Sequence, residues 1–97
     1  MIYLLVSSLN MKMYLFIVFI DSGVRTGTDV LKALALGARG VFIGRPILYG
    51  LACGGDDGVR HVLEILKTEL KYDMACCGLK SIDEINQNIL YKPHEKL

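Results

Sequence analysis

The sequence has almost no net charge and few residues suited to redox or metal chemistry. Its 97 residues carry a formal net charge of +1, so no basic excess points to nucleic acid or to an anionic membrane surface as a partner. The three cysteines are an odd number, and Cys76 and Cys77 are adjacent, which fits neither a disulfide framework nor a metal site. We therefore expect reduced thiols in an intracellular protein, and no bound metal.

The chain is also too short for more than one small domain. A chain of this size buries roughly 60–70% of its unfolded surface, which allows a modest core. Hydrophobic residues make up 53% of the sequence and charged residues 22%, and this balance argues against disorder. The composition therefore predicts a packed globule or an association with a membrane.

The first twenty residues, "MIYLLVSSLNMKMYLFIVFI", contain sixteen apolar residues. A stretch of roughly 20 apolar residues can span a bilayer, but Lys12 falls near its middle, where a lysine costs about 2.5–3.5 kcal/mol. The second half, Met13–Ile20, is an unbroken apolar run rich in β-branched and aromatic residues, as in a strand buried on both faces. We favour this strand over a membrane helix or anchor, and over a segment with no settled structure.

After Ile20 the sequence alternates between turn-prone loops and regular patterns. The loop "DSGVRTG" leads into "DVLKALALG", which predicts an α-helix capped by Thr28 or Asp29 and ended by Gly37. The segment Gly40–Gly44, "GVFIG", then predicts a short buried strand. The resulting order of strand, helix, strand and helix is that of β/α units with parallel strands, so the predicted fold class is α/β.

The rest of the chain predicts one more loop and two helices. The stretch "RPILYGLACGGDDG" is expected to be a loop, with room for a short helix after Pro46. The stretch "VRHVLEILKTELKYDMACC" has apolar residues at helical spacing and ends before Gly78. Ser81, with Glu84 three residues later, has the spacing of a capping box and predicts a last short helix.

Two glycine–arginine signals follow the two predicted strands. Arg25 and Arg45 each come within a few residues of a buried apolar run. Such loops open at the carboxyl ends of the strands, where ligands bind, and the next helix directs its positive N-terminus to the same place. Glycine lets the backbone approach an anion closely, and arginine offers a planar fork of donors to phosphate oxygens. The pair predicts one phosphate site; the alternative is two ordinary surface arginines.

The stretch "DSGVRTGTDVLKALALGARGVFIGRPILYGLACGGDDGVRHVLEILKTEL" resembles the C-terminal part of the FMN-dependent 2-hydroxy-acid oxidases, the glycolate and long-chain 2-hydroxy-acid oxidases of peroxisomes. The resemblance runs from Asp21 to about Leu90. It implies the last two β/α units of a (β/α)₈ TIM barrel, incomplete and preceded by a hydrophobic segment. It also implies FMN as the cofactor. For the full-length family it implies a homo-oligomer that converts a 2-hydroxy acid and O₂ into a 2-oxo acid and H₂O₂.

The resemblance also implies which residues of this chain bind the cofactor. The family's phosphate loop reads Asp-Gly-Gly-Val-Arg, and a second motif reads Gly-Arg-Pro. The matching residues, which would hold the FMN phosphate and the ribityl end, are Asp21, Gly23, Val24, Arg25, Gly44 and Arg45. Ser22 stands where the family has glycine. If the backbone there has a positive φ, Ser22 introduces a strain of about 1–3 kcal/mol.

No catalytic residue is expected in this chain. The family's proton-abstracting histidine lies in an Asn-His-Gly-Gly-Arg segment, beside an arginine that binds the substrate, and this segment is absent from the sequence. His61 falls in the middle of a predicted helix, where we expect it to face solvent, and His94 falls in the polar tail. Neither is expected to take over the catalytic role. The resemblance therefore implies that this chain is inactive by itself.

The resemblance divides the chain into three parts. These are a hydrophobic extension to which we assign no structure (1–12), a partial FMN hydroxy acid dehydrogenase barrel domain (13–91) and a polar C-terminal tail (92–97). The tail ends in Lys96 and Leu97, which match the last two residues of the peroxisomal signal Ser-Lys-Leu, whereas Glu95 does not match. We expect a peroxisomal protein by resemblance, or otherwise a cytoplasmic one. The alternative function is a non-catalytic truncated product, or a small membrane-anchored protein that uses residues 1–20.

Overall fold

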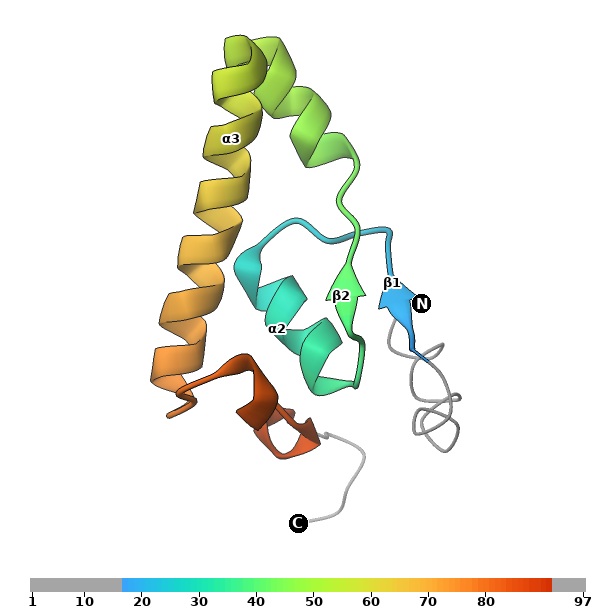
Figure 1. Ribbon diagram of the computed structural model, residues 1–97, viewed down its shortest axis with the longest axis vertical. Coiled ribbons are helices and arrows are strands. Elements are labelled where there is room, and N and C mark those ends of the chain that lie inside the picture. Colours follow the sequence, from blue (N-terminus) through green and yellow to red (C-terminus); the bar gives the residue numbers. More distant parts are fainter. Residues whose placement is uncertain (1–16, 92–97) are drawn as a thin grey trace.

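The computed structural model describes residues 17–91 and shows an α/β arrangement of two short strands and two helices (Figure 1). The elements are β1 (Phe19–Ile20), α2 (Gly27–Ala35), β2 (Gly40–Val41), α3 (Arg45–Cys76) and the 3₁₀ turns η2 (Ile82–Glu84) and η3 (Gln87–Ile89). This confirms the predicted order of strand, helix, strand and helix. Residues 1–16 and 92–97 lie outside the described residues, and with them the whole hydrophobic extension (1–12), His94 and the C-terminal signal.

The two strands are parallel neighbours, as predicted. Phe19 pairs with Gly40 and Ile20 with Val41, and the Phe42 N–H donates to the Ile20 carbonyl over 2.8 Å. Within the described residues β1 begins at Phe19, and residues 13–16 of the predicted strand lie outside this part. Strand β2 is shorter than expected, because the chain turns away after Ile20 and the hydrogen bond from Phe42 to Ile20 is the last one between the two strands at this end.

Helix α2 begins two residues earlier than predicted. Its N-cap is Thr26, not Thr28 or Asp29, because Thr26 is extended (φ −134°, ψ 163°) and its hydroxyl accepts from the Asp29 N–H over 3.2 Å. Asp29 is the third helical residue and completes a capping box with Thr26. At the other end Gly37 has φ 109° and ends the helix, as expected.

The core lies between α2 and one face of the sheet. Figure 1 shows α2 between the two strands and the second segment of α3. The buried cluster consists of Ile20, Ala33, Leu36 and Ala38, with Val18, Val41 and Leu90 packed against it. On the opposite face of the sheet, Phe19 and Phe42 are 55% and 62% exposed, and their ring centroids lie 5.6 Å apart. Only one face of the sheet is therefore covered within residues 17–91.

Helix α3 is a helical hairpin, which corrects the loop predicted for residues 45–58. The chain is helical from Arg45 onward and reverses at Gly54 and Gly55, whose φ values are −153° and 64° (Figure 1). The two segments touch where Gly58 meets Gly50, and a Cβ atom on Gly58 would overlap the Gly50 carbonyl oxygen. Two glycines at the crossing therefore allow the segments to pack backbone against backbone.

The C-terminal region also differs from its prediction. Ser81 makes no capping hydrogen bond, and Ile82–Glu84 is a 3₁₀ turn rather than the start of an α-helix. The Glu84 carboxylate instead accepts from the Lys80 N–H over 2.6 Å. Within residues 17–91, no helix combines the length and the apolar character needed to cross a bilayer. The membrane alternative depends mainly on residues 1–16, outside the described part.

Candidate functional site

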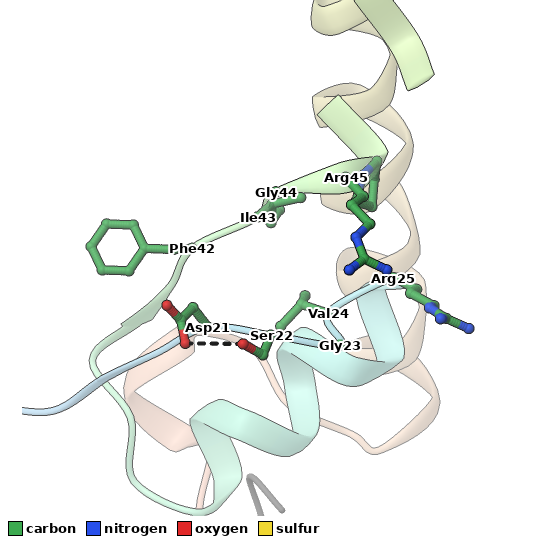
Figure 2. A pocket seen from close by; sticks show the side chains of 10 residues that line it. Asp21, Ser22, Gly23, Val24, Arg25, Phe42, Ile43, Gly44 and Arg45 are labelled. Carbon is green, nitrogen blue, oxygen red and sulfur yellow. Dashed lines mark hydrogen bonds between the residues drawn. The ribbon is translucent and has the colours of Figure 1, made fainter. Parts of the chain in front are cut away.

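The carboxyl ends of the two strands open onto one cavity of about 410 Å³. All six residues predicted to bind the cofactor line it, and Figure 2 shows them around this space. The loop after β1 supplies one side of the cavity, and the segment after β2 supplies the other. Its lining is Asp21, Ser22, Gly23, Val24, Arg25, Phe42, Ile43, Gly44, Arg45 and Pro46. The structure therefore brings the two predicted motifs together, whereas their role in binding stays a prediction.

The first wall is a tight loop with two left-handed residues. Ser22 and Gly23 have φ values of 73° and 75°. Ser22 therefore meets the condition for strain, because a residue with a Cβ atom rarely adopts this conformation. Its hydroxyl donates to the Asp21 carboxylate over 3.3 Å. Val24, by contrast, is only 4% exposed, so its buried side chain anchors the middle of the loop. The backbone directly before Arg25 is therefore fixed in place.

The backbone at the end of this loop is held by the side chain of Asp29. One carboxylate oxygen of Asp29 accepts from the N–H groups of Arg25, over 3.0 Å, and Thr26, over 3.2 Å. The next N–H group, that of Gly27, donates to the Glu69 carboxylate on α3 over 3.1 Å. Carboxylates of the protein thus accept from the three consecutive N–H groups of Arg25, Thr26 and Gly27 at the start of α2. These three groups are therefore not offered to an anion in this structure, in contrast to what the sequence led us to expect of this helix end.

The second wall contains the N-terminus of α3, which no side chain caps, in contrast to the capped N-terminus of α2. Gly44 is the N-cap of α3, no side chain caps this end, and Pro46 stands in the first turn. Pro46 has no N–H group and the Ile47 N–H donates to the Gly44 carbonyl over 3.0 Å, so the N–H groups of Gly44 and Arg45 are the ones at this end that can donate to an anion. A Cβ atom built on Gly44 would meet nothing within 4 Å, so there is open space beside its backbone. The start of α3 thus leaves backbone donors facing the cavity, and their use by a ligand stays a prediction.

The two arginines lie on the same side of the cavity but differ in direction. In Figure 2, Arg45 extends from the start of α3 toward the loop that carries Val24 and Arg25. The Arg25 side chain extends outward from the loop, away from Asp21 and Phe42. Both side chains are exposed. Two permanent cations thus stand at one end of the cavity, and the Asp21 carboxylate stands at the other.

Sequence reasoning missed several residues at this site. Phe42, Ile43 and Pro46 add apolar wall, and they could have been found because they directly continue the strand that leads to Arg45. Asp29 could have been found from its spacing to Thr26, since Thr-x-x-Asp is a capping-box pattern. An N-cap at Thr28 or Asp29, as predicted, would not pair Asp29 with Thr26, so the prediction left this pattern out.

Other chemistry-bearing residues lie away from the cavity. His61 is exposed on α3, as expected, and Cys53, Cys76 and Cys77 are free and exposed. In the described part of the chain, no group of histidine, cysteine and carboxylate side chains could hold a metal ion.

Comparison with known proteins gives one consistent relationship. Residues 8–92 match the FMN-dependent dehydrogenase family. The 2-hydroxyacid oxidase 2 of Mus musculus is 60% identical over 73 residues, which cover 75% of this chain and 21% of that protein. The peroxisomal (S)-2-hydroxyacid oxidase GLO3 of Arabidopsis thaliana is 54% identical over 80 residues, covering 82% of this chain and 22% of that protein.

Solved structures agree with the sequence matches. A mutant of flavocytochrome b2 superposes with a TM-score of 0.83 and 43% identity, over 91% of this chain and 24% of that chain. The monotopic membrane protein (S)-mandelate dehydrogenase superposes with a TM-score of 0.82 and 41% identity, over 90% of this chain and 23% of that chain. The present chain thus spans about a fifth of the length of the curated relatives it matches.

Proposed function

The chain belongs to the FMN-dependent dehydrogenase family, whose members use FMN, and we propose that it forms the part of a 2-hydroxy-acid oxidase that binds the phosphate and ribityl end of this cofactor. In this proposal residues 13–91 are the last two β/α units of a TIM barrel. The observation that carries the proposal is the convergence of two Gly-Arg loops on one cavity at the carboxyl ends of β1 and β2.

The donors at the cavity fit a phosphate dianion. Arg45 and Arg25 supply charged, directional donors, and the uncapped start of α3 at Gly44 supplies backbone donors. Phosphate sites formed after strands seven and eight are frequent in β/α barrels. The residues present therefore suit the terminal phosphate of FMN better than a neutral or cationic group.

The distribution of charge suggests how the ligand is oriented. Figure 2 places Asp21 and Phe42 toward one side of the cavity, and Arg25 and Arg45 toward the other. A carboxylate repels a phosphate but accepts hydrogen bonds from hydroxyl groups. We therefore place the phosphate near the arginines and a ribityl hydroxyl near Asp21.

Bound FMN would supply the hydride acceptor for the oxidation of a 2-hydroxy acid to a 2-oxo acid, with O₂ as the final oxidant. The residues of this chain would bind and orient, and none of them would move a proton. His61, the one histidine within residues 17–91, is exposed on α3 and does not line the cavity. By this proposal the chain alone has no turnover. A peroxisomal location is proposed from the printed names of the Arabidopsis relatives.

Flavin binding tests the proposal directly. Riboflavin lacks the phosphate, so the 97-residue chain should bind FMN more tightly than riboflavin, as measured by quenching of flavin fluorescence. Arg45→Ala should lower the FMN affinity about tenfold, the scale of one charged hydrogen bond, and leave the riboflavin affinity unchanged. Arg60→Ala, an exposed position on α3 outside the cavity, is the matched control. Equal affinities of the unmodified chain for the two flavins would overturn the proposal.

A further inference from the structure

We propose that Asp29 is a positioning residue for Arg25, and through it for the phosphate group of the bound flavin; this rests on the proposed function. Asp29 lies on α2 and does not line the cavity. It acts instead on the backbone of the loop that does. Its carboxylate accepts from the Arg25 N–H over 3.0 Å and from the Thr26 N–H over 3.2 Å.

The geometry of the loop explains why this contact matters. Arg25 sits between a buried residue, Val24, and the N-cap, Thr26. Burial of Val24 fixes the chain before Arg25, and the Asp29 carboxylate holds the two peptide N–H groups that flank the Arg25 Cα, those of Arg25 and Thr26. The Arg25 side chain itself is exposed, so the placement of its stem depends on the backbone. Loss of the Asp29 carboxylate would free this backbone and spread the guanidinium over more positions, which weakens its bonds to one phosphate.

The same contact has a second consequence for the site. Because Asp29 occupies the N–H groups of Arg25 and Thr26, neither group is available to a ligand. Arg25 can therefore reach the phosphate only with its side chain, and backbone donors have to come from other residues of the lining, among them Gly44 at the start of α3. Because of Asp29, the end of the loop after β1 contributes the Arg25 side chain and not its backbone N–H group, whereas the segment after β2 contributes both a side chain and backbone donors.

The capping box provides a matched control within the same two residues. Asp29→Ala removes the acceptor for the Arg25 N–H. Thr26→Ala removes the reciprocal bond, in which the Thr26 hydroxyl accepts from the Asp29 N–H, and leaves the bond to Arg25 in place. Both changes weaken the start of α2. Asp29→Asn keeps an acceptor oxygen and tests for rescue.

The readout is the ratio of the FMN affinity to the riboflavin affinity in the full chain, measured by fluorescence quenching. A loss of folded protein lowers both apparent affinities by the same factor, so the ratio reports the phosphate contacts alone. We expect the ratio to fall about tenfold in Asp29→Ala and to stay near the unmodified value in Thr26→Ala and Asp29→Asn.

Three results would overturn the inference. The first is an unchanged ratio of FMN affinity to riboflavin affinity in Asp29→Ala. The second is a fall of this ratio in Thr26→Ala that equals the fall in Asp29→Ala. The third is a ratio in Asp29→Asn as low as that in Asp29→Ala, or a loss of all flavin binding in Asp29→Asn. A ratio near one in the unmodified chain would instead contradict the proposed function, so the two failures are distinguishable.

Discussion

Ser22 occupies a backbone position that suits glycine. Its φ of 73° lies in the left-handed region, and the next residue, Gly23, has nearly the same φ. The family motif named in the sequence analysis has glycine at both positions, and here Ser22 adopts the left-handed conformation despite its Cβ atom. An L-residue in this region is strained by about 1–2 kcal/mol relative to its preferred conformations.

Ser22→Gly should therefore stabilise the chain. The gain should be about 0.5–1 kcal/mol, because relief of the strain is partly offset by the greater chain entropy of glycine in the unfolded state. Urea unfolding followed by circular dichroism measures the difference. Gly23→Ala is the reciprocal change and should lower stability, since it places a Cβ atom at φ 75°. A lower unfolding free energy for Ser22→Gly would show that the hydroxyl bond to Asp21 outweighs the strain.

At the scale of elements, the close contact between the two helical segments of α3 requires glycine at position 58 but not at position 54. A Cβ atom on Gly58 would overlap the Gly50 carbonyl oxygen, whereas one on Gly54 would meet nothing within 4 Å. We expect Gly58→Ala to lower the free energy of unfolding by about 1–3 kcal/mol, through forced separation of the two helical segments. Gly54→Ala should change it by less than about 0.5 kcal/mol.

Denaturant unfolding of the two glycine variants, measured side by side, checks this prediction. Both substitutions replace glycine by alanine in the same hairpin, so the change in side chain and in unfolded-chain entropy is matched. Equal losses at Gly54 and Gly58 would mean that the segments do not pack as closely as the structure has them.

The elements also show which parts of the fold were predictable. The strands and α2 were found because short apolar runs and helical spacing are local signals. The hairpin in α3 was missed because Pro46 and four glycines between residues 45 and 58 resemble a loop. Proline is in fact favoured in the first helical turn, and here it stands there. The role of the glycines is a contact between segments, which local patterns do not contain.

The sequence predicted which residues line the candidate site, but not which backbone N–H groups are free to donate to a ligand. Glycine and arginine after each strand located both walls, since carboxyl ends of parallel strands adjoin. The state of the two helix ends could not be foreseen in the same way. The Glu69 carboxylate that occupies the Gly27 N–H comes from 42 residues further along the chain, and only the packing of α3 on α2 brings it there.

At the scale of the whole molecule, much apolar surface is uncovered. The sheet has two strands, so each strand keeps one unpaired edge within residues 17–91. The large hydrophobic side chains exposed in this part are Ile17, Phe19, Phe42, Leu48, Tyr49, Leu51, Leu63, Ile65, Tyr72, Ile82 and Tyr91. Open edges and apolar faces of this kind favour association with other chains.

We expect the isolated chain to self-associate as its concentration rises while it stays folded, and to be stabilised by the complementary part of a family barrel. The partner to use is the 2-hydroxyacid oxidase 2 of Mus musculus without the segment that this chain matches. Coexpression should give a complex that copurifies and retains flavin, because barrel strands would cover both edges of the sheet.

Phe42→Asp should weaken copurification, since Phe42 is 62% exposed on the uncovered face. Thr68→Asp, at an exposed polar position on α3, controls for the added charge. Size-exclusion chromatography of the chain alone provides the opposing outcome: a chain that stays monomeric at every concentration measured would show that the two β/α units need no further strands.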